Sequence, residues 1–199
     1  EYLAGTLFAD ANPVDDALVA DMGRVLGKMS HILATFTHPA AHRTLEWDVM
    51  RGDWIANYLH AFADPAQRAM VQQHLTRYLE SMAQYRNTVR YGVIHGDAND
   101  YNVLVGAPGY MKRTITGLLD FGDMMHTAVV SELAIASAYA IMNHPHPVDA
   151  LMLMVTQYHA EYPLNEAEVA LLYDLICIRL CISVTVSAIR KQERPDDPY

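Results

Sequence analysis

Cysteine is scarce in this sequence of 199 residues, which contains Cys177 and Cys181 and no others. They lie four positions apart in an apolar run, and this spacing places both on one face of a helix. Two cysteines cannot build the dense framework of a disulfide-stabilised domain, and a zinc site would need further ligands that this neighbourhood lacks. We therefore expect buried free thiols, a reducing compartment and a cytoplasmic protein.

Positive charge is scarce as well, because 14 Lys and Arg face 23 Asp and Glu and the formal net charge is -9. Nucleic-acid phosphates are bound mainly by clustered Lys and Arg, so we expect no nucleic-acid partner. No apolar stretch approaches the roughly 20 unbroken residues of a membrane helix. We therefore expect no membrane partner either.

The residues that are abundant indicate one folded core, with 52% hydrophobic and 19% charged residues. Helical apolar spacing and the start signals Asn12-Pro13 and Asp64-Pro65 predict long helices. We expect helices over residues 13–37, 64–85, 130–142, 148–162 and 166–191. Short strands are predicted at 92–94, 102–105 and 114–119, the last two forming a hairpin around a glycine turn at 106–109. The predicted fold class is α+β and mostly helical.

Two motifs flank this hairpin. Residues 95–102 read HGDANDYN and fit the pattern H-x-D-x-x-x-x-N, and residues 120–122 read DFG directly after the second strand. Phosphoryl transfer needs a carboxylate that orients the attacking hydroxyl and accepts its proton, and it needs oxygen ligands that hold magnesium against the nucleotide phosphates. In the kinase template these roles fall to Asp97 as base and to Asn102 and Asp120 as metal ligands.

Two features separate this chain from a protein kinase. Gly96 stands where a protein kinase usually has Arg, and the next helix is expected within a few residues of Gly122. A peptide-binding kinase needs a long activation segment after DFG. We therefore expect the acceptor to be a small molecule with a hydroxyl group.

These motifs resemble the aminoglycoside phosphotransferase and choline kinase superfamily. The run 117–124, GLLDFGDM, with Glu132-Leu133-Ala134, is most similar to hydroxylysine kinase and to kinase domains fused to class-III aminotransferases. The resemblance implies the C-terminal, large lobe of a protein-kinase-like fold with a small catalytic β-hairpin. It covers residues 1–199, with 1–8 as hinge segment and 91–123 as the catalytic and metal-binding loops.

The nucleotide-covering part of that family is missing from the sequence. No G-x-G-x-x-G occurs, and the three lysines, Lys28, Lys112 and Lys191, are expected in a helix, the hairpin and the tail. The family places the glycine-rich loop and its lysine before the hinge. We therefore expect an N-terminal kinase lobe upstream of Glu1, and an inactive fragment without it.

Supporting roles are expected for six further residues. The resemblance implies that His95 braces the loop through hydrogen bonds. Asp123 is expected to cap the following helix, with metal binding as the alternative. For Asn99 and Asp100 the sequence leaves two roles open, contact with the acceptor or shaping of the loop. Glu132 and Arg179 lie on apolar helices and are expected to pair, as in a structural salt bridge behind the site.

Taken together, these features predict transfer of the gamma-phosphoryl of ATP or GTP to a hydroxyl, with Mg²⁺ as cofactor and hydroxylysine or a similar amino alcohol as leading acceptor. Choline, an aminoglycoside or homoserine are alternative acceptors. A non-catalytic kinase-like interaction domain is the alternative from another class, but such a domain has no need of Asp97, Asn102 and Asp120 together.

Overall fold

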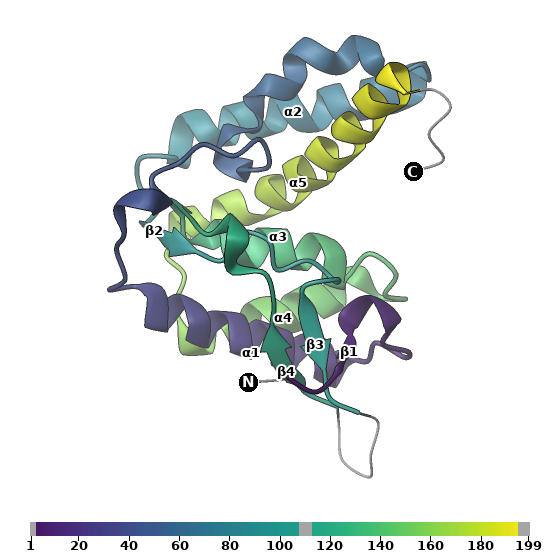
Figure 1. The fold of residues 1–199 in the computed structure, drawn as a ribbon. Helices are drawn as coiled ribbons and strands as arrows, with labels where there is room; N and C mark the ends of the chain where they lie inside the picture. The colour runs from purple at the N-terminus through teal and green to yellow at the C-terminus, as the bar shows by residue number, and fades with distance from the viewer. Residues whose placement is uncertain (1–2, 108–112, 195–199) are drawn as a thin grey trace.

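A computed structural model describes residues 3–107 and 113–194 of the chain. Helices dominate it, and two small antiparallel sheets lie among them (Figure 1). The helices are α1 (Asp16–Leu33), α2 (Pro65–Tyr85), α3 (Val130–Ala140), α4 (Pro147–Glu161) and α5 (Glu166–Glu193), with a kinked 3-10 segment, η3 (Val49–Ala61), before α2. The α+β, mostly helical prediction is confirmed.

The helix starts show which local signals determine where the chain turns helical. Asp64 caps α2 by accepting the Ala66 N–H at 2.9 Å, as the Asp64-Pro65 signal predicts. Asn12-Pro13 is wrong as the start of α1, because the helix begins at Asp16 and Asp15 is its cap, accepting the Leu18 N–H at 2.9 Å. The Asp15 carboxylate, which lies closer to the apolar residues of α1, therefore caps the helix in place of Asn12.

The first sheet has the strand order β1-β3-β4, formed by Thr6–Leu7, Val103–Val105 and Ile115–Leu118. The hairpin predicted between β3 and β4 is therefore present. The turn expected at 106–109 and Lys112 lie partly or wholly outside the described residues. The expected hinge segment contributes β1 as an edge strand that pairs with β3, with Thr6 opposite Val105.

The second sheet pairs β2 (Tyr91–Ile94) with β5 (Met125–Ala128). No strand was predicted at residues 125–128, which form β5, whereas the predicted start of the next helix at Val130 is confirmed. The strand forms by pairing with β2. Because β2 lies far away in the sequence, no local pattern indicates this pairing. Its register places Ile94 opposite Met125, so the ladder holds both ends of the segment that carries the two motifs.

The hydrophobic core surrounds α3, whose side chains Val130, Leu133 and Ile135 are fully buried. In Figure 1 α1 and α4 lie together on one side of α3, and α2 and α5 lie together on the other. The backbones of α1 and α4 approach closely at two glycines. A Cβ added at Gly23 would lie 2.2 Å from Met154 O, and one at Gly27 would lie 2.7 Å from Tyr158 O. Glycine at these positions allows the two helices to pack.

Helix α5 is long and apolar enough to cross a membrane by length and composition, although the sequence shows no unbroken apolar run of that size. More than half of its apolar stretch is buried inside the fold, as in the central helix of a globular core. Both cysteines lie on this helix as free thiols; Cys181 is buried as predicted, whereas Cys177 is only half-buried. Burial raises the pKa of the Cys181 thiol to about 11.

Candidate functional site

The motif loop starts directly after β2 and is fixed by a buried carboxylate. The His95 N–H donates to Glu132 Oε2 at 2.6 Å, and the Gly96 N–H donates to the same oxygen at 3.4 Å. Gly96 has φ +84°, a conformation that glycine adopts without a steric penalty. A Cβ there would lie 2.7 Å from Asp123 O, so the loop also needs glycine where it passes the second motif.

Asp97 lies at the centre of a network of nitrogen donors. Its Oδ2 accepts the side-chain amides of Asn102 at 2.9 Å and Asn99 at 3.0 Å. Its Oδ1 lies 3.1 Å from Nη2 of Arg179 on α5. The carboxylate is therefore held from two sides, and its orientation is determined by three different side chains.

The electrostatics of Asp97 combine opposing effects. Burial raises the pKa of this carboxyl, the Arg179 guanidinium and the Asn99 amide lower it, and the net shift is upward. A carboxylate with a raised pKa is a stronger base than an ordinary Asp, while the paired guanidinium keeps its ionised form accessible. This combination suits a group that accepts a proton.

His95 connects the two motifs and is completely buried. Its Nε2 lies 2.8 Å from Leu119 O, and its Nδ1 accepts the Asp97 N–H at 3.3 Å. These partners assign the ring hydrogen to Nε2 in the neutral form. The ring also packs edge-on against Phe121 at 4.7 Å between centroids. The structure thus places His95 where it braces the loop from behind.

The hairpin brings the predicted metal ligands together. Leu119, next to Asp120, donates its N–H to Asn102 O at 2.8 Å. The amide nitrogen of Asn102 also donates to Asp97 O at 2.9 Å, which leaves its side-chain oxygen for other partners. Asp120 is exposed in the left-handed conformation at φ 57°, and its Oδ1 accepts the Gly122 N–H at 3.1 Å.

This donor set fits a hard divalent cation held by few protein ligands. Asn102 and Asp120 offer one amide and one carboxylate oxygen from the paired ends of the hairpin, and these are the ligand types that Mg²⁺ takes when phosphates and waters complete its shell. The described residues contain no group of three or more His, Cys, Asp or Glu that could bind a metal alone. Asn102 and Asp120 alone would need additional ligands to complete a Mg²⁺ shell.

The sequence suggested that Asp123 caps the following helix, and this prediction is wrong. The residue before α3 is Val129, and no side chain caps that helix. Asp123 instead lies 3.9 Å from Arg43, which also donates to the backbone oxygens of Gly122 and Met124. Arg43 therefore clamps the loop after Asp120. The sequence contains no signal for this role, because Arg43 lies in an irregular segment far from both motifs.

Glu132 and Arg179 do not pair with each other in a salt bridge behind the site. Glu132 accepts the two loop amides, and its Oε1 has no hydrogen-bond partner among the described residues. Burial raises the pKa of Glu132 against the opposing effect of His95. Arg179 pairs with Asp97 instead. Both residues therefore act on the motif loop itself.

Asn99 and Asp100, whose roles the sequence left undecided, have different surroundings in the structure. Asn99 shapes the loop, because its side chain bonds Asp97 and also accepts the Tyr101 N–H at 2.8 Å. Asp100 lines a different cavity, formed with residues 8–14 and 139–145. Burial raises the pKa of the Asp100 carboxyl.

A cavity of about 490 Å³ opens on Asp97. Its volume lies in the range of pockets for small molecules. One end is acidic, with Asp97 and Asp123, and one wall is a face of α5. The lining residues are Trp47, Asp97, Asn99, Asp123, Arg179, Ile182, Ser183, Val186, Ser187 and Arg190. A hydroxyl compound of moderate size would reach the Asp97 carboxylate from this cavity.

A family model described as "Phosphotransferase enzyme family" matches residues 1–164. The hydroxylysine kinase of Danio rerio is 28% identical over 205 residues, covering 98% of this chain and 56% of the relative. The chain thus spans about half the length of the curated relatives it matches.

Solved structures share the fold at low sequence identity. A microcompartment-associated aminopropanol kinase superposes with a TM-score of 0.62 at 18% identity, covering 90% of this chain and 62% of that one. An amicoumacin kinase in complex with AMP-PNP, Ca²⁺ and Ami gives a TM-score of 0.64 at 16% identity, covering 96% of this chain and 56% of that one. At these identities the likeness concerns the fold.

Proposed function

The chain belongs to the phosphotransferase enzyme family, and from this premise we propose that it transfers the gamma-phosphoryl group of ATP or GTP to a hydroxyl of a small molecule. One observation carries the proposal. Asp97 presents an oriented carboxylate to a cavity of small-molecule size, Asn102 donates to that carboxylate, and Leu119, the neighbour of Asp120, pairs with Asn102. The proposed base therefore faces the acceptor space and is bonded directly to one proposed metal ligand, Asn102.

In this proposal Asp97 accepts the proton of the attacking hydroxyl. Arg179, Asn99 and Asn102 hold the carboxylate in place, so the hydroxyl meets an oriented acceptor and little reorganisation is needed during the reaction. Phosphoryl transfer passes through a loose transition state, so positioning accounts for much of the effect.

Asn102 and Asp120 would hold Mg²⁺, which when bound neutralises developing charge on the transferred phosphoryl group. The side-chain oxygen of Asn102, which accepts no hydrogen bond from residues 3–107 or 113–194, and the exposed carboxylate of Asp120 support this assignment. The amicoumacin kinase of the same fold contains AMP-PNP with Ca²⁺ and supports a nucleotide donor with a divalent cation. The choice of Mg²⁺, and of ATP or GTP, is part of the proposal.

Hydroxylysine is the leading acceptor, because hydroxylysine kinases match 98% of the chain and an aminopropanol kinase shares its fold. Choline, an aminoglycoside and homoserine are the competing acceptors. We also propose that the described unit is the large lobe of a kinase-like enzyme that works in the cytoplasm, with the glycine-rich loop supplied by a separate lobe.

The test uses the protein that carries this sequence at its full natural length. Transfer of labelled phosphate from ATP or GTP to hydroxylysine, choline, homoserine and an aminoglycoside would be measured with Mg²⁺. We expect phosphorylation of one acceptor class, abolished by Asp120→Ala. Nucleotide binding without transfer to any hydroxyl compound would instead indicate a kinase-like interaction domain.

A further inference from the structure

One face of α5 forms a continuous wall of the Asp97 cavity. Arg179, Ser183, Ser187 and Arg190 recur at intervals of three or four residues and all line the cavity. Such intervals place side chains on the same side of a helix. From Arg179 to Arg190 the helix advances about 16 Å along its axis. The wall therefore begins at the Asp97 carboxylate and ends at a second guanidinium.

The two arginines at the ends of this wall differ in their partners. Arg179 is buried and pairs with Asp97. Arg190 is exposed, and no carboxylate of residues 3–107 or 113–194 lies within ion-pair distance of it. Arg190 lines the same cavity as Asp97, from the C-terminal end of the α5 wall. Among the residues that the structure describes, the cation at the far end of the cavity therefore has no carboxylate partner.

Two further donors of the cavity walls lack partners. Trp47 Nε1 and Arg179 Nε are buried, and neither donates a hydrogen bond to any described residue. Both residues line the cavity. Buried N–H groups are normally satisfied, and these two nitrogen atoms lie beneath the cavity surface.

We propose that Arg190 binds a carboxylate group of the acceptor while the acceptor hydroxyl lies at Asp97. The inference rests on the proposed function and narrows its substrate class to hydroxy acids whose carboxylate lies several bonds from the reacting hydroxyl. Arginine suits this role because its planar guanidinium binds a carboxylate through two parallel hydrogen bonds. Cationic acceptors such as choline offer no partner for it.

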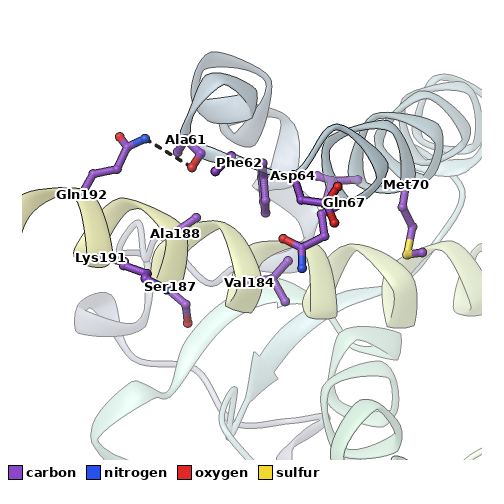
Figure 2. Close-up of a pocket in the computed structure, with 12 residues that line it drawn as sticks. Ala61, Phe62, Asp64, Gln67, Met70, Val184, Ser187, Ala188, Lys191 and Gln192 are labelled. Carbon is purple, nitrogen blue, oxygen red and sulfur yellow. Dashed lines mark hydrogen bonds between the residues drawn. The ribbon is translucent and has the colours of Figure 1, made fainter. Parts of the chain in front are cut away.

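A purely structural role for Arg190 has to be separated from this one, because a cation in the last turn of a helix interacts favourably with the helix dipole. Lys191 is the matched control. It lies in the same turn of α5 but lines a different cavity of about 780 Å³, between α5 and residues 61–71 of η3 and α2 (Figure 2). Gln192 closes that side by donating to Ala61 O at 3.2 Å.

The experiment compares acceptors that differ in one charge. Hydroxylysine and homoserine would be assayed beside their carboxamides with the full-length protein, its Arg190→Gln, Arg190→Lys and Lys191→Gln variants, and saturating nucleotide. We expect Arg190→Gln to raise the KM for the acid about 10- to 100-fold, as expected for the loss of a charged hydrogen bond. The KM for the amide and for nucleotide should stay unchanged, Arg190→Lys should recover part of the loss, and Lys191→Gln should match the parent.

Two results would overturn the inference, and they are distinguishable. If acids and amides are phosphorylated equally well, or if Arg190→Gln weakens both alike, Arg190 does not bind a carboxylate, although the enzyme is a phosphotransferase. If no hydroxyl compound of the panel is phosphorylated by the parent protein, the proposed function fails and the assignment of Arg190 fails with it.

Discussion

Arg179 on the last helix places its guanidinium 3.1 Å from Oδ1 of Asp97 in the motif loop. The pair joins α5 to the loop across 82 positions of the sequence. It also places a permanent positive charge beside the carboxylate to which we assign the proton transfer. Burial raises the pKa of Asp97 and Arg179 opposes that rise, so this one contact tunes the base as well as orienting it.

This relationship predicts a change in pH dependence for Arg179→Met. Removing the guanidinium removes an effect that lowers the pKa of Asp97, so its pKa should rise further. Because the ionised carboxylate is the active form, activity should then be lost at a higher pH on the acid side. We expect the acid limb of kcat/KM to move upward by about 1 pH unit. Arg179→Lys keeps a positive charge and should move the limb less; identical acid limbs in all three proteins would contradict the tuning role.

Two substitutions of Glu132 should differ in their effect on the free energy of unfolding. Glu132→Ala leaves the buried N–H groups of His95 and Gly96 without an acceptor, which should lower the free energy of unfolding by about 2–4 kcal/mol and lower turnover. Glu132→Gln retains an oxygen for the same amides. Since burial already raises the pKa of Glu132, a neutral side chain suits the site, and the loss should stay within about 1 kcal/mol. Urea unfolding of both variants checks this, and equal stabilities would exclude the amide-holding role.

The two metal-ligand candidates should respond differently to metal concentration. Asp120→Ala removes the charged ligand and should abolish turnover at every Mg²⁺ concentration tested. Asn102→Ala removes one neutral ligand, so higher Mg²⁺ or Mn²⁺ should restore part of the activity. Titrations of activity against metal separate these cases. Near-normal turnover of Asp120→Ala would show that the metal assignment is wrong.

Acid stability should depend on a pair outside the site, Arg90 and Glu168. Burial raises the pKa of Glu168, but hydrogen bonds from Arg90 and the Asn165 N–H lower it by more, so its folded-state pKa lies below the usual value. The ionised carboxylate therefore contributes stability that is fully present above its unfolded pKa and is lost as the pH falls through the folded one.

Arg90→Met would leave the buried Glu168 carboxylate without its guanidinium. The free energy of unfolding near pH 7 should fall by about 3 kcal/mol, the lower end for breaking a buried pair, because Arg90 is partly exposed. Its dependence on pH below about 4.5 should also weaken. Urea titrations at several pH values measure both effects, and a variant with the parent's acid profile would contradict the role given to the pair.

The sequence predicted those parts of the fold that local patterns encode. Helices α2 to α5 lie within a few residues of the predicted ranges, because proline, capping residues and apolar spacing mark them directly. Strand β5 was missed, since it exists through pairing with β2, whose register no local signal records. The start of α1 was misplaced because two capping signals compete there and Asp15 prevails over Asn12.

The site shows the same division. The spacing of the two motifs predicted that the hairpin would bring Asn102 and Asp120 together, and it does. The partners of Glu132 and Arg179 could not be predicted, because their helices meet the loop only in three dimensions. Arg43 and Arg190 had no signal at all: their roles depend on what lies opposite them in space.

The most direct test of the account is the turnover of Asp97→Asn in the full-length protein, measured beside Asp100→Asn. The Asp97 variant keeps the shape and one oxygen but loses charge and basicity, so kcat should fall about 10²–10⁴-fold while the KM for nucleotide changes little. Asp100, in the same loop but lining another cavity, should tolerate the same change. An Asp97→Asn protein that kept its rate and lost nucleotide affinity would contradict the assignment of Asp97 as the base.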